Sequence, residues 1–183
     1  MKRSLFGLLL VLIMSVGFAQ KEKELKTPDL PINEDTKLVT YQDVITQKGS
    51  PQELYDRAMI WVKKFYKNTG EVIKKSDRDA GVIEMRSSVR IFSILKDGTR
   101  SPKNIVYYNF RLECRQDRYR YTITNFNEKA TAAAPIEVWL DKTHLKWHSG
   151  QFEYLNQIDV QIRELIESLE EGMYPIIEKK DEW

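Results

Sequence analysis

The sequence has one cysteine and two histidines, and this scarcity excludes two common ways of building a small stable domain. Cys114 has no partner within the chain, so no internal disulfide can form. His144 and His148 have no cysteine or close glutamate beside them, and a zinc site needs at least three protein ligands. We therefore expect no metal site, a domain stabilised by its hydrophobic core, and a buried, apolar role for Cys114 in a strand.

Motifs that carry catalytic chemistry are also lacking. The eight glycines are scattered and form no phosphate-binding loop. No serine or cysteine stands in a recognisable nucleophile motif, and Asp77 and Asp79 flank a turn, which explains them better than paired acid–base work. We assign no catalytic residue and no cofactor, and we do not expect an enzyme.

Only one long hydrophobic run is present, and it lies at the N-terminus. Residues 5–18 are apolar except for two glycines and a serine, and they follow Lys2 and Arg3. A stable membrane span needs about 20 apolar residues, so this shorter run is typical of a cleaved secretory signal. We expect a signal peptide over 1–19, cleavage before Gln20, and a periplasmic or secreted protein without a stable membrane anchor. The alternative is an uncleaved signal anchor.

A charge excess of either sign is absent from the expected mature chain. The full sequence has 29 Lys and Arg against 27 Asp and Glu, and the loss of Lys2 and Arg3 makes the two counts equal. A neutral domain lacks the basic bias of nucleic-acid-binding proteins, so we expect no nucleic-acid partner. The hydrophobic content of 42% and the length are those of one globular domain.

The first half of the chain predicts a linker, a strand and a helix. Residues 20–36 combine prolines and charges, and 37–47 have the composition of a strand. The segment Ser50-Pro51-Gln52-Glu53 is typical of a helix start, with a serine cap, a proline in the first turn and a glutamate that completes a capping box. Apolar residues then recur every three or four positions, and Gly70 is expected to end the helix in the left-handed conformation.

Four strands are expected next, over 71–76, 82–95, 104–115 and 118–126. A two-residue turn between the last two would pair residues whose numbers sum to 233. Cys114 then faces Tyr119, and Phe110 faces Ile123, on one apolar side of the sheet. A slip of one residue would mix apolar and charged side chains on both faces, so the pattern favours this register.

The remaining chain predicts an insertion and a second helix. Residues 128–150 form the insertion, with a possible short hairpin of 136–140 and 143–147. A helix over 154–171 follows, and 173–183 form a C-terminal tail. The resulting order, β-α-β-β-β-β-α, predicts an α+β two-layer sandwich over 37–172, in which two helices cover one face of a curved antiparallel sheet.

Four stretches of this chain recur together in one domain family. They are Gly49-Ser50-Pro51-Gln52-Glu53-Leu54-Tyr55-Asp56-Arg57-Ala58 leading to Trp61, Val72-Ile73, Asp79-Ala80-Gly81-Val82-Ile83, and Asp117-Arg118-Tyr119-Arg120-Tyr121-Thr122-Ile123-Thr124-Asn125. Through them the chain resembles an exported bacterial domain of unknown function, number 4468, which is described as having a TATA-binding-protein-like (TBP-like) fold. The resemblance implies a sheet flanked by helices and an exported location. It implies no activity and does not cover 128–150.

The outward face of the expected sheet carries a set of arginines, with Tyr107 in line on the third of the four strands. The set is Arg86, Arg90, Arg111, Arg115, Arg118 and Arg120. Guanidinium groups bind carboxylates and phosphates through two parallel hydrogen bonds, so such a face can bind an anion. Glu84 and Glu113 are interleaved with the arginines. The alternative is therefore a solvated face on which the charges pair with one another across the strands, as Glu113 would with Arg120.

These observations favour a non-catalytic binding module of the cell envelope. Its partner would be an envelope protein or an anionic ligand, bound on the arginine face or on the insertion 128–150. One alternative is a structural or assembly domain without a ligand, and another is an enzyme of unrecognised type. No feature of the sequence indicates the oligomeric state.

Overall fold

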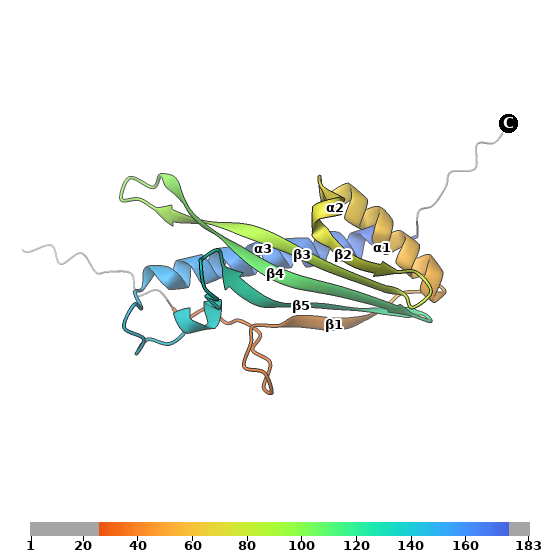
Figure 1. Ribbon diagram of the computed structural model, residues 1–183, viewed down its shortest axis with the longest axis horizontal. Helices are drawn as coiled ribbons and strands as arrows, with labels where there is room; N and C mark the ends of the chain where they lie inside the picture. The colour runs from red at the N-terminus through yellow and green to blue at the C-terminus, as the bar shows by residue number, and fades with distance from the viewer. Residues whose placement is uncertain (1–25, 176–183) are drawn as a thin grey trace, which may run out of the picture.

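A computed structural model describes residues 26–175. The expected signal peptide over 1–19 and most of the expected tail lie outside the described residues. Within them, no helix is long and apolar enough to cross a membrane. The elements, shown in Figure 1, are β1 (Tyr41–Thr46), α1 (Pro51–Phe65), α2 (Thr69–Val72), β2 (Ile73–Asp77), β3 (Val82–Ile94), β4 (Arg100–Arg115), β5 (Arg118–Glu128), the 3-10 helix η1 (Ile136–Trp139) and α3 (Gly150–Gly172).

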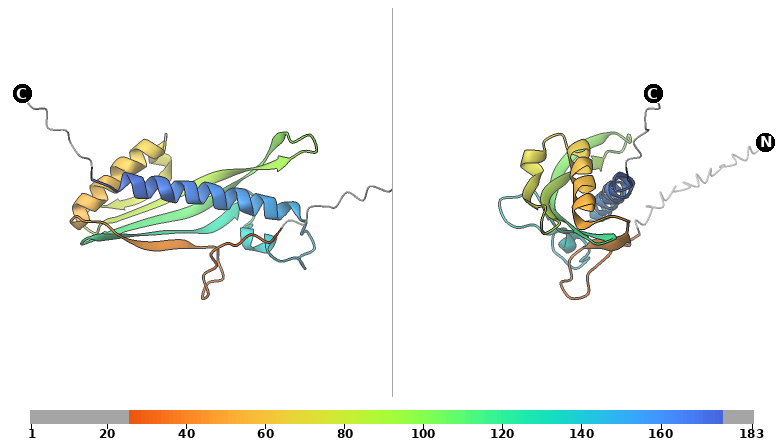
Figure 2. Two further views of the ribbon diagram at one scale, coloured as in Figure 1. Left: turned by 180° about the vertical axis from the view of Figure 1, so that it is seen from behind. Right: turned by 90° about the vertical axis from the view of Figure 1, so that its right-hand side faces the viewer.

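The five strands form one antiparallel sheet in the order β1-β5-β4-β3-β2. Helices α1 and α3 both lie on the same face of this sheet, and the end-on view of Figure 2 shows the sheet curving around them. The arginine face is therefore the outer side of the curve. The predicted α+β sandwich, with a curved sheet covered on one face by two helices, is confirmed.

Helix α1 begins as the sequence predicts. The Ser50 hydroxyl accepts a hydrogen bond from the Glu53 N–H at 3.2 Å, and the Glu53 carboxylate accepts one from the Ser50 N–H at 2.7 Å. The hydrogen bond from the Ser50 backbone is the main cause that lowers the pKa of Glu53. The capping box is complete, with Pro51 in the first turn.

The predicted register of the last two strands is also confirmed, because Cys114 lies opposite Tyr119 and Phe110 opposite Ile123. The turn between the strands places Asp117 at φ 55° without a glycine. Its carboxylate accepts the Gly49 N–H at 3.1 Å, and its own N–H donates to the Gly49 carbonyl at 3.0 Å. The turn is thus tied to the chain that enters α1, which compensates for the lack of a glycine at this positive φ.

Trp61 joins the two helices to the sheet. Its ring meets Phe110 of β4 edge-on, with centroids 6.0 Å apart, and its indole N–H donates to the Ser168 hydroxyl of α3 at 3.1 Å. Gly172 lets the end of α3 approach closely, since a Cβ there would lie 2.5 Å from the indole Cδ1. This tryptophan is therefore a central contact of the core.

The predicted end of the first helix is wrong. Helix α1 ends at Phe65, and Gly70 lies inside the one-turn helix α2 instead of forming a left-handed exit. Tyr66 turns to an extended conformation, packs edge-on against Trp61 at 6.0 Å, and its hydroxyl lies 3.5 Å from that of Tyr108. Burial of this aromatic ring against the core ends the helix before the glycine is reached.

The suggested hairpin of 136–140 and 143–147 is also wrong. Ile136 and Trp139 are both buried, and residues three apart share a face of a 3-10 helix, which is the structure η1 adopts. The Trp147 indole N–H donates to the Trp139 carbonyl at 3.0 Å, which folds the following loop back onto η1. Core contacts by Ile136, Trp139 and Trp147, rather than strand pairing, therefore organise this segment.

Gly81, in the turn between β2 and β3, should be intolerant of any side chain. It adopts φ +69°, and a Cβ there would lie 2.6 Å from the Cys114 carbonyl oxygen. We expect Gly81→Ala to lower the free energy of unfolding by about 2–4 kcal/mol, because backbone strain and steric overlap add. Urea denaturation measures the loss. Gly98→Ala is the matched control, since Gly98 has φ +82° with nothing within 4 Å of a Cβ, and equal losses would contradict the steric argument.

Candidate functional site: the outer face of the sheet

All six predicted arginines lie on the sheet face opposite the helices, but they divide into three groups. Two of them, Arg111 and Arg120, belong to a row of ion pairs. Another two, Arg115 and Arg118, face each other at the end of β4 and β5. The last two, Arg86 and Arg90, stand apart on β3. The face is thus a series of distinct environments rather than one uniform basic surface.

The ion-pair row crosses the sheet from Glu84 through Arg111 and Glu113 to Arg120. Arg111 pairs with Glu84 and lies 3.5 Å from Glu113, and the Arg120 Nε and Nη2 donate to Glu113 Oε2 at 2.8 and 2.5 Å. Partial burial alone would raise the pKa of Glu113, but the hydrogen bond and charge of Arg120, helped by Arg111, lower it. Glu113 is therefore ionised at neutral pH, and these four residues compensate one another.

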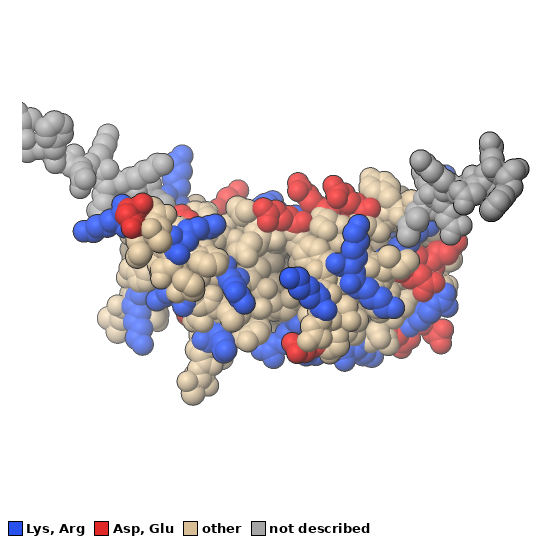
Figure 3. All heavy atoms as spheres, turned by 90° about the horizontal axis from the view of Figure 1, so that it is seen from above, with Lys and Arg blue, Asp and Glu red and all other residues tan. Residues whose placement is uncertain are grey.

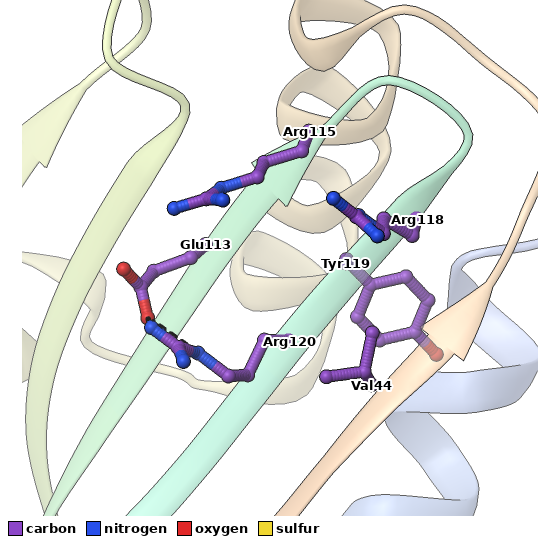
Figure 4. A pocket seen from close by; sticks show the side chains of 6 residues that line it. All are labelled: Val44, Glu113, Arg115, Arg118, Tyr119 and Arg120. Atoms are coloured by element: carbon purple, nitrogen blue, oxygen red, sulfur yellow. Dashed lines mark hydrogen bonds and ion pairs between the residues drawn. The ribbon is translucent and has the colours of Figure 1, made fainter.

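A shallow hollow of about 120 Å³ lies beside the end of this row. Its lining residues, drawn in Figure 4, are Val44, Glu113, Arg115, Arg118, Tyr119 and Arg120. Three guanidinium groups thus surround one carboxylate, and the carboxylate is already bonded to Arg120. Among residues 26–175, Arg115 and Arg118 form no ion pair, so the hollow retains positive charge and free hydrogen-bond donors.

Arg86 has a different neighbour. Its guanidinium carbon lies 5.2 Å from the centre of the Tyr107 ring, a cation–π contact that holds the side chain against β4. A wider depression of about 460 Å³ lies beside it, lined in part by Lys74, Asn109 and Thr124. Lys74 was not predicted as part of this face. It lies at an irregularity between β2 and β3, and no sequence signal marks that bulge.

Cys114 is 3% exposed on the inner side of the sheet, as predicted, and burial raises the pKa of its thiol to about 12. At pH 8 only about one thiol in ten thousand would be ionised.

We expect Cys114 to react with a disulfide reagent only as fast as the protein unfolds. A Ser76→Cys variant, at an exposed position of β2, should react at once, and equal rates for the two thiols would show that Cys114 is accessible.

The two histidines lie in the loop before α3 and are exposed. Within the part of the chain that the structure describes, no group of three or more His, Cys, Asp and Glu residues is placed to hold a metal ion.

The near-equal numbers of basic and acidic residues, 29 and 27, conceal an uneven distribution. Helix α3 carries six acidic residues and only one basic residue, Arg163. In Figure 3 acidic side chains lie along the upper edge and at the right-hand end, whereas the middle of the visible face carries mainly basic side chains. Composition alone could not reveal this separation, because the two populations cancel in the total.

The chain was compared with known proteins. No curated protein sequence matches it. A TBP-like protein from Parabacteroides distasonis ATCC 8503 is 16% identical, with a TM-score of 0.60 over 74% of this chain and 92% of that one. A DUF4468 family protein from Bacteroides ovatus ATCC 8483 is 15% identical, with a TM-score of 0.62 over 81% of this chain and 93% of that one. At such identities the likeness shows the fold alone.

A family model described as domain of unknown function (DUF4468) with TBP-like fold matches residues 41–129. The match begins with β1 and ends directly after β5, so it includes the whole sheet and helix α1. Residues 41–129 of this chain therefore form a DUF4468 domain, a domain of unknown function with a TBP-like fold.

Proposed function

We propose that this protein is a non-catalytic binding module that takes a carboxylate or phosphate group of its partner into the hollow at the end of β4 and β5. The observation that carries the proposal is the facing pair Arg115 and Arg118, which form no ion pair with any other described residue. A third arginine, Arg120, lies beside them and is held in place by Glu113. A guanidinium group offers two parallel donors to either kind of anion.

The expected affinity follows from the exposure of the hollow. A hydrogen bond to a charged group contributes about 1.5–3 kcal/mol, but association and side-chain ordering offset much of this gain. Because Arg115 and Arg118 are exposed, salt also screens their charges. We therefore expect weak, salt-sensitive binding of a single anionic group, and tighter binding only where a partner adds further contacts.

The proposed site of action is the cell envelope. The basic start, short apolar run and small residues near Ala19 support export of the chain before it folds. An envelope partner that presents an acidic segment would fit the hollow.

A purely assembly role through strand addition is less well supported. Strand β1 is an edge of the sheet, but the Asp43 carboxylate accepts the Val44 N–H at 2.7 Å. A charged side chain that accepts the hydrogen bond of a backbone N–H on an edge strand opposes pairing with another strand. This feature favours binding through the sheet face over polymerisation through its edge.

Titration calorimetry of the chain from Gln20 onward tests the proposal. An aspartate-rich peptide should bind saturably and more weakly as salt is added, and an asparagine peptide of equal length should not bind. Inorganic phosphate should compete with the acidic peptide. Equal heats from the two peptides would contradict an anion site.

Glu113→Gln should strengthen binding of the acidic peptide, because it removes the one carboxylate of the hollow and releases Arg120 from its ion pair. We expect about a fivefold to tenfold gain in affinity, which corresponds to roughly 1–1.4 kcal/mol. Glu167→Gln, at an exposed position of α3, changes the net charge equally and is the matched control. The same gain in both variants would indicate a general charge effect instead of a local site.

A further inference from the structure

We propose that the end of the molecule opposite the hollow docks on an anionic lipid bilayer. The surface consists of the β3–β4 hairpin tip, residues 94–100, and the loop 141–149 that precedes α3. Figures 1 and 2 show both segments at the same end of the molecule, whereas the β4–β5 turn lies at the other end. The proposal uses none of the residues of the hollow and is independent of the proposed function.

Large aliphatic side chains stand in water at both protrusions. Leu145 is completely exposed (102%), and Ile94 and Leu95 are 48% and 49% exposed. Isolated exposed apolar residues are common on protein surfaces. Here, however, they occupy the tips of two projecting segments at one end, which is the arrangement that reaches a flat surface first.

Basic residues flank these apolar tips. Lys96, Arg100 and Lys103 accompany the hairpin tip, with Asp97 as its only acidic residue, and Lys142 and Lys146 accompany the loop, with Asp141. The two segments and the adjacent Lys103 together therefore carry five basic and two acidic side chains, an excess of three positive charges when both histidines are neutral.

The two acidic residues are engaged in local turns. The Asp97 carboxylate accepts the Thr99 N–H at 2.9 Å, and the Asp141 carboxylate accepts the Thr143 N–H at 2.9 Å and its hydroxyl at 2.6 Å. These hydrogen bonds direct both carboxylates toward their own backbone. The acidic groups therefore serve the turns. Arg100 and Lys142 lie over the rings of Phe92 and Phe152, at 5.3 and 5.4 Å from their centres. Lys96, Lys103 and Lys146 form no ion pair within residues 26–175 and remain available to a partner.

Both protrusions are held in shape by the fold. The Leu95 N–H donates to the Thr99 carbonyl at 2.9 Å, and the Gly98 N–H donates to the Leu95 carbonyl at 2.9 Å, which closes the hairpin tip. The loop is anchored by the half-buried Trp147 through its bond to the Trp139 carbonyl. Leu95 and Leu145 are thus presented to solvent by ordered segments, so little conformational entropy would be lost on docking.

A bilayer fits this surface better than a folded protein does. The apolar residues project from separate tips, and a protein partner would need two matching recesses. A bilayer accepts protruding apolar side chains at the boundary of its headgroups, and anionic lipids attract the surrounding lysines and arginines. Apolar insertion and charge attraction would act together, giving reversible, salt-sensitive attachment.

Vesicle co-sedimentation tests the proposal, with the chain from Gln20 onward, which contains every described element and lacks the N-terminal apolar run. We expect binding to vesicles of equal parts phosphatidylcholine and phosphatidylglycerol, and little binding to phosphatidylcholine alone. The double variant Leu95→Gln/Leu145→Gln should lower the partition coefficient at least about tenfold. Lys96→Gln and Lys146→Gln should each lower it about fivefold.

Matched controls remove similar side chains elsewhere. Ile60→Gln replaces an exposed aliphatic residue of α1 and should leave vesicle binding unchanged, as should Lys63→Gln. Circular dichroism of each variant tests whether it is folded. Absence of binding to anionic vesicles, or unchanged binding by the double leucine variant, would overturn the proposal. Loss of vesicle binding on substitution of Arg115 and Arg118 would instead place the lipid contact on the hollow and also overturn it.

Discussion

Reversing the charge of Arg115 and Arg118 together is expected to weaken binding of an acidic peptide at least about a hundredfold, because two charge-assisted contacts of about 1.5–3 kcal/mol each are lost and repulsion replaces them. Both side chains are exposed, so Arg115→Glu/Arg118→Glu should leave the fold intact. Titration calorimetry at low salt measures the change directly.

The control for this variant lies on the same face of the same sheet. Arg86→Glu/Arg90→Glu changes the net charge by the same amount on β3, away from the hollow. A long-range charge effect would weaken binding equally in the two double variants. A local site requires a much larger loss for the pair at positions 115 and 118.

Trp61→Ala is expected to lower the free energy of unfolding by about 3–5 kcal/mol, the usual range for truncating a buried large aromatic residue. The change would empty the space between α1, α3 and the sheet, and would leave the Ser168 hydroxyl without its donor. Gly172, which gives the indole room at the end of α3, offers no side chain to fill the cavity. A loss of this size is a large fraction of the stability of a typical domain.

Phe65→Ala provides the comparison, because Phe65 stacks on Trp61 at 5.1 Å but is 42% exposed. The free energy of unfolding should fall by less in this variant, by about 1–2 kcal/mol. Urea denaturation followed by far-ultraviolet circular dichroism measures both variants. Similar values for the two would show that Trp61 does not join the layers as described.

The sequence predicted those features that depend on local chemistry or on strict alternation. Ser50 and Glu53 are close in sequence, and their capping geometry follows from residue type alone. The β4–β5 register follows from a period of two, since any slip of one residue would bury charges such as Glu113. This register was sufficient to place Arg115 opposite Arg118.

Other features depend on contacts distant in sequence and were missed. Tyr66 ends α1 by packing against the core, and Ile136 and Trp139 form a 3-10 helix because both reach the core. The division of the arginine face also required the structure. The predicted register places Glu113 opposite Arg120, and this ion pair is confirmed. The additional contacts of Arg111 with Glu84 and Glu113 depend on side-chain geometry that a pattern of alternation does not specify.

The most direct test of the central claim is a nuclear magnetic resonance titration of the native chain from Gln20 onward with inorganic phosphate. The account predicts saturable changes in the amide chemical shifts of residues 113–120 and of Val44, which lies across the hollow. The Arg115→Glu/Arg118→Glu variant should lose these changes. Saturable shifts centred elsewhere, or none at low salt, would contradict an anion site at the end of β4 and β5.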